Sequence, residues 1–256
     1  MSLIPWGILA SQSQGIPEPP VLGYSLWLDG YDESVFSFSS GSVVSEWRDK
    51  SGNDNDFAQA TVSAQPTRAS SGLITFDGSN DWLEASTKFM NNAHNGGSNT
   101  FFIVAKPNRA AVFPIISNGW ITSRNVGFGI LYNNNPSKVF AFVNRGVASS
   151  TVVSGSSTST QGTTDLAAWT IRLDANATVS QRAEFYLNSG SIETGSNSGS
   201  NPPSTANSTN LPGIGSDADG VYYADMNLAE ILWYESDLST ADREDTRDYL
   251  IAKWGI

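Results

Sequence analysis

Short apolar runs separated by turn residues recur along most of this 256-residue chain, and they constrain its fold most strongly. Residues 24–29 alternate towards two leucines, and residues 73–77 and 82–85 flank Gly-Ser-Asn-Asp at 78–81, which is typical of a β-hairpin. Residues 100–106 are continuously apolar, as expected for a strand buried on both faces. Similar runs occupy residues 43–48, 112–117, 126–133, 138–144, 168–173, 182–188, 211–215 and 222–234. This spacing predicts an all-β fold, a two-sheet antiparallel jelly-roll sandwich, and excludes a parallel α/β fold.

One short helix is predicted near the end of the chain. Ser239 and Asp242 have the Ser-x-x-acid spacing of a helix N-cap, and acids in the first turn suit the positive end of the helix dipole. Lys253 would fall in the last turn and Gly255 would end the helix. The residues expected to pack one side of it on the sheet are Leu238, Tyr249, Leu250 and Trp254.

The first 22 residues differ from the rest of the chain. Prolines at 17, 19 and 20 favour an extended linker, and an apolar peptide precedes them. That peptide could fold back on its own domain or lack structure, or it could anchor the chain in another protein through Ile4, Trp6, Ile8 and Leu9. Its apolar stretch is too short for the roughly 20 residues of a membrane span. We therefore divide the chain into an anchoring arm with a Pro-rich linker, 1–22, and one jelly-roll domain, 23–256.

Composition narrows the possible chemistry. The chain has no cysteine, one histidine, 14 Lys plus Arg and 25 Asp plus Glu, for a net charge of −11. The lack of cysteine excludes disulfide scaffolds and thiol nucleophiles, and the negative charge argues against nucleic-acid binding. The acids gather in residues 29–81 and 217–248. A sandwich would bring these two segments to one rim if its first and last strands are neighbours, and such a rim would suit a cation or repel anions.

The sequence contains no clear pattern of catalytic residues, and we expect no catalytic activity. A glycosidase needs two carboxylates across a sugar, yet no predicted strand carries alternating acids, and Glu230 and Glu235 would face opposite sides of a regular strand. A serine hydrolase would have to use His94, but the chain contains no Gly-x-Ser-x-Gly turn. His94 lies among Asn and Gly residues and is interpreted as a solvated loop residue.

Two acidic turns are candidate calcium sites. Asp49, Asn53 and Asp54 lie in one turn, and Asp217 and Asp219 lie in another. Loop oxygens are the ligands that calcium prefers. The first turn lacks the glutamate of an EF-hand, since position 60 is alanine, and side-chain-to-backbone turns in solvated loops are the favoured explanation of both clusters.

Sugar binding requires exposed aromatic rings with polar groups beside them. Six of the eight tryptophans follow strand or helix patterns and are predicted to lie in the core: Trp27, Trp47, Trp82, Trp169, Trp233 and Trp254. One of Tyr222 and Tyr223 would face outward if both lie on a strand. The candidate ligand-binding residues are Trp120, Arg124, Asn125, Tyr132 and Tyr222.

A recurring order of motifs links the chain to a known fold family. Leu-Trp-Leu-Asp at 26–29 is followed by Trp-Arg-Asp-Lys-Ser-Gly-Asn at 47–53 and by Ile-Thr-Phe-Asp-Gly-Ser-Asn-Asp-Trp-Leu at 74–83, and Ala-Glu-Ile-Leu-Trp-Tyr at 229–234 precedes the predicted helix. From Leu22 to Ile256 the sequence resembles laminin-G-like, concanavalin A-like jelly-roll domains of phage and bacterial surface proteins. The resemblance implies rim loops that bind sugars, calcium or protein, with the motif residues themselves mostly structural.

The opening residues 3–10 resemble the start of phage virion proteins. Together these resemblances imply a virion surface protein, anchored to other virion proteins by its N-terminal arm, that serves as a tail fibre or receptor-binding protein adhering to a host glycan. The alternatives are a capsid decoration protein without a ligand and a carbohydrate-binding module of a secreted protein. By analogy with such fibres, a homo-oligomer, most simply a trimer, is expected.

Overall fold

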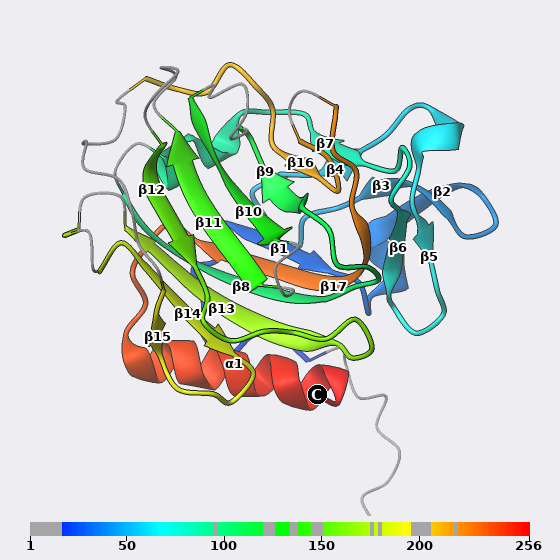
Figure 1. The fold of residues 1–256 in the computed structure, drawn as a ribbon. Helices are drawn as coiled ribbons and strands as arrows, with labels where there is room; N and C mark the ends of the chain where they lie inside the picture. Colours follow the sequence, from blue (N-terminus) through cyan, green and yellow to red (C-terminus); the bar gives the residue numbers. More distant parts are fainter. Residues whose placement is uncertain are drawn as a thin grey trace, which may run out of the picture.

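The computed structural model describes residues 17–94, 97–119, 126–133, 138–144, 151–174, 177–178, 181–195, 206–217 and 220–256. Within these ranges the chain is almost entirely antiparallel β-structure, with one α-helix near its end. The predicted all-β sandwich with a single C-terminal helix is therefore confirmed. Figure 1 shows three layers, in which one sheet lies between a second sheet above and the helix below.

The middle layer, which we call the helix-side sheet, is organised around the long strand β17 (Asp225–Tyr234). One edge of β17 pairs with β8 (Ser98–Pro107), and the other edge pairs end to end with β1 (Leu26–Asp29) and β6 (Ile74–Asp77). Beyond β8 the sheet continues through β13 (Ala167–Asp174), β14 (Ala183–Leu187) and β15 (Glu193–Thr194). The first and last strands, β1 and β17, are thus neighbours, as the acid-rich rim hypothesis required.

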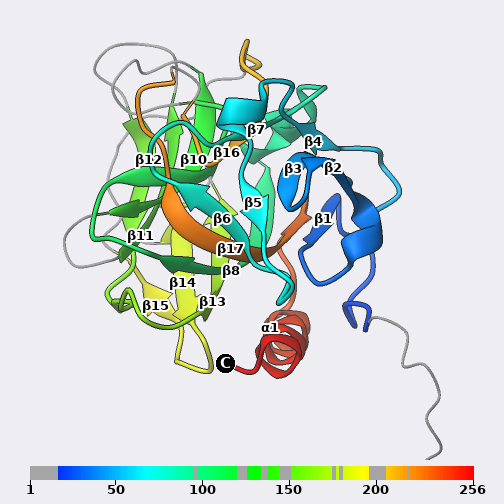
Figure 2. The ribbon, with the colours of Figure 1, turned by 90° about the vertical axis from the view of Figure 1, so that its right-hand side faces the viewer.

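The outer layer, the second sheet, is built from shorter strands. It comprises β2 (Phe36–Ser40), β3 (Val43–Trp47), β4 (Phe57–Ala58), β7 (Leu83–Ala85), β16 (Gly213–Ile214), β9 (Phe113–Ser117), β10 (Gly127–Asn133), β11 (Lys138–Asn144) and β12 (Thr151–Ser156). Strand β5 (Thr67–Arg68) pairs with both β3 and β6 and joins the layers at a corner, which Figure 2 shows from the side. Short 3-10 turns occur at Glu33–Val35, Val62–Ala64 and Phe89–Ala93.

The core lies between the two sheets, and a second apolar layer lies between the helix-side sheet and the helix. In β8, Phe101 and Ile103 enter the core, whereas Phe102 and Val104 face the helix, and all four are buried. This strand is therefore covered on both faces, which explains why its sequence is continuously apolar and does not alternate.

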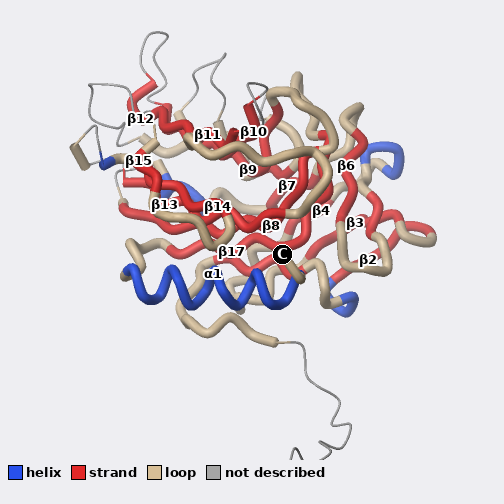
Figure 3. Tube along the Cα trace, turned by 60° about the horizontal axis from the view of Figure 1, so that its bottom comes forward, coloured by secondary structure: helices blue, strands red, loops and turns tan. Residues whose placement is uncertain are grey.

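Helix α1 (Thr240–Trp254) forms where the sequence predicts it. The Ser239 side chain accepts a hydrogen bond from the Asp242 N–H, and Gly255 ends the helix in the left-handed conformation, with φ of 67°. The helix runs across the outer face of the helix-side sheet (Figure 3) and buries Leu250 against it. No helix in the described part of the chain has the length and apolar character needed to cross a membrane.

Two acids from the rim segments are buried beneath this helix. Asp29 on β1 lies opposite Glu230 on β17, and the Lys253 ammonium from α1 lies 2.8 Å from a carboxylate oxygen of each. The indole N–H groups of Trp27 and Trp254 donate to Glu230 at 2.8 and 2.7 Å. These acids therefore lock the C-terminal helix onto the sheet and are not part of an exposed rim.

The prediction that His94 is solvated is wrong. Its side chain is fully buried, and its Nε2 accepts a hydrogen bond from the Ser208 backbone N–H at 3.2 Å. Burial lowers the pKa of His94 from 6.5 to about 4. The sequence suggests a loop because polar residues surround His94, but the 3-10 turn at Phe89–Ala93 leads it into a buried position beside Ser208.

This buried histidine makes stability dependent on pH. The unfolded chain binds a proton at His94 near pH 6.5 and the folded protein only near pH 4, so the free energy of unfolding falls as the pH drops through this window. A shift of this size corresponds to about 3 kcal/mol. In a His94→Gln variant the amide oxygen still accepts the hydrogen bond from Ser208, but residue 94 no longer titrates. We expect the free energy of unfolding of the wild type, measured in urea, to fall steadily relative to that of the variant between pH 6.5 and 4. Parallel stability curves for the two proteins would contradict this assignment.

Candidate functional site

A groove opens on the face of the second sheet that points away from the core. It consists of two adjoining hollows of about 280 and 470 Å³, which share Trp82, Glu84 and Leu211. Tyr223 lies at one end of the groove, and Asp56 and Gln59 lie at the other. We call this feature the Trp82–Tyr223 groove.

Strand register explains why the groove lies here. In β7 the side chains of Leu83 and Ala85 are buried in the core, so Glu84 projects from the opposite face. Its neighbours across the sheet are Ala58 on β4 and Gly213 on β16. Because both neighbours are small, they leave open space on either side of the glutamate.

The loop that follows β16 forms the wall at one end. Gly215 begins it with a φ of 81°, a conformation that residues with a side chain rarely adopt. One carboxylate oxygen of Asp217 accepts hydrogen bonds from the N–H groups of Val221 and Tyr222 at 2.8 and 3.0 Å, which closes the loop. The next residue, Tyr223, forms an isolated β-bridge with Ser216 and lines the groove.

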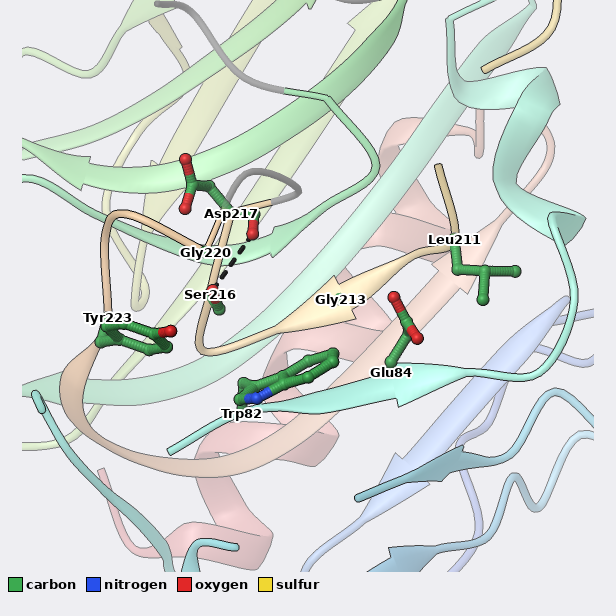
Figure 4. Close-up of a pocket in the computed structure, with 8 residues that line it drawn as sticks. All are labelled: Trp82, Glu84, Leu211, Gly213, Ser216, Asp217, Gly220 and Tyr223. Carbon is green, nitrogen blue, oxygen red and sulfur yellow. Dashed lines mark hydrogen bonds between the residues drawn. The ribbon is translucent and has the colours of Figure 1, made fainter. Parts of the chain in front are cut away.

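Figure 4 shows how the groove side chains are arranged. The Trp82 ring lies near the Tyr223 ring, while Glu84 and Leu211 lie at the other end of the tryptophan. The Asp217 carboxylate points away from Trp82 (Figure 4), so it organises the loop and does not face the same space. Two partly exposed rings therefore lie along one groove, which offers apolar faces with polar groups close by.

Two polar side chains of the groove carry groups that have no hydrogen-bond partner in the described part of the chain. Within the described residues, the Glu84 carboxylate has no hydrogen-bond or ion-pair partner, and burial raises its pKa. Gln59 is 7% exposed, and its side-chain N–H₂ group has no hydrogen-bond partner, whereas its amide oxygen accepts from the Thr61 N–H. Asp56 accepts a hydrogen bond from the Asp49 N–H through one oxygen only. The groove thus presents one free acceptor beside two aromatic rings, and its wall holds a buried donor without a hydrogen-bond partner.

The ligand-binding residues predicted from the sequence are only partly tested. Trp120, Arg124 and Asn125 lie outside the described residues. Tyr132 is buried, and its hydroxyl donates to Gln161 at 2.7 Å, so its predicted exposure is wrong. It precedes an Asn-rich turn, but its strand parity directs it into the core.

Tyr222 and Tyr223 take different positions in the same loop. Tyr222 is partly buried and packs over Leu131 and Phe142 on the outer face of the second sheet. Tyr223 instead enters the groove. The two tyrosines lie outside the named strands and both are partly exposed, and the one that lines the groove is Tyr223, not the predicted Tyr222.

The predicted calcium turn is held together by its own hydrogen bonds. Both oxygens of the Asp49 carboxylate accept hydrogen bonds, from the N–H groups of Trp27, Ser51 and Asn55 and from the Ser51 hydroxyl. Asn53 turns its N–H₂ group to the Ser25 carbonyl at 3.2 Å, and Asp54 has a φ of 56°. The described residues contain no group of three or more His, Asp or Glu side chains placed to hold a metal.

The second calcium candidate is also a turn. Asp217 closes the loop after β16 as described above, and Asp219 lies outside the described residues. The anchoring residues Ile4, Trp6, Ile8 and Leu9 lie outside them as well.

The central residue of the groove, Trp82, does not lie where the sequence pattern predicts it. Its position at the start of a strand-like run predicts a core residue, yet Trp82 is only partly buried. Its spacing contained the needed signal, because Trp82 and Glu84 are two residues apart and must share one face of the strand. A charged residue at that spacing indicates the outer face.

A further hollow of about 530 Å³ lies beside the end of helix α1, lined in part by Leu73, Lys106 and Trp254. Its one aromatic ring is already engaged, because the Trp254 indole N–H donates to the buried Glu230. The Trp82–Tyr223 groove is therefore the stronger candidate site.

Comparison with known proteins supports the fold. Neither a known family model nor a curated protein sequence matches the chain. Among solved structures it is similar to Trypanosoma rangeli sialidase in complex with sialic acid, with a TM-score of 0.54 and 12% identity over 93% of this chain and 35% of that chain. It is also similar to the binding domain of botulinum neurotoxin DC, in complexes with rat synaptotagmin II and with SialylT. The TM-score is 0.57 in both cases, at 10% and 11% identity, over 90% of this chain and 52% of the other. The chain thus spans about a third to a half of these proteins, and the likeness establishes a shared β-sandwich fold.

Proposed function

We propose that this protein is a glycan-binding β-sandwich module that holds its ligand in the Trp82–Tyr223 groove. The observation that carries the proposal is the pair of partly exposed rings along one groove, with a free carboxylate and a free amide beside them. Aromatic faces stack on the C–H faces of sugar rings, and amide and carboxylate groups bind sugar hydroxyls. The similar structures support glycan binding as a function of this fold, since one is a complex with sialic acid and another a complex with SialylT, but they do not identify the sugar that this groove would bind.

A virion role is part of the same proposal and rests on the resemblance of the sequence to phage surface proteins. In this role the arm at residues 1–22 anchors the module to other virion proteins and leaves the groove facing the host surface. Mass spectrometry of purified particles of a phage that encodes the chain would detect it there, and its absence from such particles would contradict the placement.

Glycan hydrolysis is the second candidate function, because two glutamates share the outer face. Glu46 pairs with Ala58 on β4, and Ala58 pairs in turn with Glu84 on β7. Two strand spacings separate the glutamates by roughly 10 Å, close to the roughly 6.5–9.5 Å of inverting glycosidases. However, Glu46 forms an ion pair with Arg48 at 2.9 Å and accepts from the Ser37 hydroxyl, which makes it a poor base for activating water. We favour binding without turnover, and release of shorter sugars from a bound glycan would contradict this view.

The proposal predicts that the two groove rings carry the binding energy. We expect Trp82→Ala and Tyr223→Ala each to weaken glycan binding by about 5- to 30-fold, because a stacked ring contributes on the order of 1–2 kcal/mol. A glycan array identifies the ligand, and isothermal titration calorimetry then compares the variants.

Tyr31→Ala provides the matched control. Tyr31 is also an exposed aromatic residue, at 53%, but it packs against Trp254 on the helix side of the molecule. Binding by this variant should match the wild type. If the wild type and the three variants bound the glycan with equal affinity and unfolded at similar temperatures, the ligand would have to bind elsewhere.

A further inference from the structure

The charged side chains that line the Trp82–Tyr223 groove are all acidic. Glu46, Asp56 and Glu84 line the two hollows, and no lysine, arginine or histidine is among the described lining residues. The carboxylate of Asp217, at the loop end, points away from Trp82 (Figure 4) and closes the loop. Arg48 neutralises Glu46 by an ion pair at 2.9 Å. Asp56 and Glu84 have no such cationic partner in the described part of the chain.

Partial burial strengthens the interactions of these carboxylates with other charges. Desolvation is the largest cause of the raised pKa of both Glu84 and Asp56, so water solvates neither carboxylate fully. A carboxylate held in this way gains most from a cationic hydrogen-bond donor, since charge-assisted hydrogen bonds are the stronger ones. It is also most strongly destabilised by a second anion nearby, because like charges interact strongly where the local dielectric constant is low.

The free amide of Gln59 gives an independent indication that a ligand occupies this space. Its N–H₂ group is buried in the wall of the groove without a hydrogen-bond partner, which is unfavourable unless a ligand or water accepts from it. A hydroxyl or an acylamino oxygen of a sugar would satisfy it. Gln59 directly follows Ala58 in the chain, Glu84 is the cross-strand neighbour of Ala58, and both side chains line the same hollow, so a sugar bearing an acceptor and a donor matches them.

We propose that the groove selects glycans by charge: it binds sugars that carry amino groups or only hydroxyl groups and excludes sialylated and uronic-acid glycans. This inference rests on the proposed glycan-binding function and adds the chemical class of the ligand. An amino group on the sugar would pair with Glu84, and the Gln59 amide would bind a neighbouring oxygen. The carboxylates of Glu84 and Asp56 would repel a carboxylated sugar before it could stack on Trp82.

The test compares glycans that differ mainly in charge. Oligomers of glucosamine, N-acetylglucosamine and glucose share one linkage and differ at a single ring position, and oligogalacturonate and sialyllactose are the anionic probes. At low salt we expect the best-bound cationic or neutral probe to bind at least ten-fold more tightly than either anionic probe. Raising the salt concentration to 0.5 M should reduce the preference for a cationic probe, because salt screens the charges.

Two variants connect the selectivity to the groove. Glu84→Gln removes one charge without changing the shape of the side chain, and we expect it to reduce the ratio of cationic to anionic affinity several-fold. Glu244→Gln removes the same charge from an exposed position on helix α1 and should leave the ratio unchanged.

The outcomes separate this inference from the proposed function. Tight binding of an anionic probe that is lost in Trp82→Ala would support glycan binding and overturn the charge selectivity. An unchanged affinity ratio in Glu84→Gln would also overturn it. Failure of every probe on a broad glycan array to bind would contradict glycan binding itself, and the selectivity with it.

Discussion

Replacing Lys253 with methionine is expected to lower the free energy of unfolding by about 3–5 kcal/mol, the usual effect of removing one partner from a buried ion pair. The Lys253 ammonium bridges Asp29 and Glu230, and the side chains of both acids are fully buried. Without it, two carboxylates that face each other across β1 and β17 would share a site with little water. Urea unfolding at neutral pH measures the change.

The remaining partners cannot compensate for the lost charge. Lys50 lies 3.1 Å from Asp29, but it also pairs with Asp32 at 3.0 Å, and the structure shows no ion pair between it and Glu230. Burial and the neighbouring Asp29 already raise the pKa of Glu230, an effect that Lys253 opposes. The variant should therefore take up a proton at this pair at a higher pH than the wild type does.

Two comparisons make the prediction specific. Lys88→Met removes an exposed lysine and should change stability by less than about 0.5 kcal/mol. Combining Lys253→Met with Glu230→Gln should recover part of the loss, because the second change removes the unpaired charge and leaves an amide for the two indole N–H groups. A loss below about 1 kcal/mol in Lys253→Met alone would show that water reaches the cluster.

The sequence predicts the helix and the sandwich better than it predicts this cluster. Local rules find the helix, because Ser239 and Gly255 mark its ends within a few residues. The ion cluster joins residues far apart in the chain: Lys253 contacts Asp29 across 224 positions. An acid within a strand usually indicates an exposed face, so only the tertiary structure reveals that helix α1 covers Glu230.

The groove shows the same limit. Glu84 opposes Ala58 and Gly213, which come from distant segments and very short strands, so no local pattern marks the space between them. The two-residue spacing of Trp82 and Glu84 could have placed the tryptophan on the outer face. The position of Tyr223 depends on a loop whose path is fixed by Gly215 and by hydrogen bonds to Asp217, and these are visible only in the structure.

That loop connects the core to the groove, and Gly215→Ala is expected to disturb both. Gly215 has a φ of 81°, and a Cβ atom placed there would lie 2.4 Å from the buried ring of Phe76. Left-handed strain of about 1–2 kcal/mol adds to an overpacking penalty of about 1–3 kcal/mol. We therefore expect the free energy of unfolding to fall by roughly 2–5 kcal/mol.

Binding should be lost along with stability in this variant. The Gly215 carbonyl accepts a hydrogen bond from the Ala224 N–H at 2.7 Å, so a shift at residue 215 moves the base of the loop that carries Tyr223. We expect glycan affinity to fall at least ten-fold at a temperature where the variant is still folded, as judged by circular dichroism. Gly23→Ala is the matched control, because its φ is 91° but nothing lies within 4 Å of the added carbon. It should show the strain alone, with full glycan affinity. If Gly215→Ala were as stable as Gly23→Ala and bound the glycan as tightly, the Phe76 ring would have room to move, and Tyr223 would hold its position without help from the core.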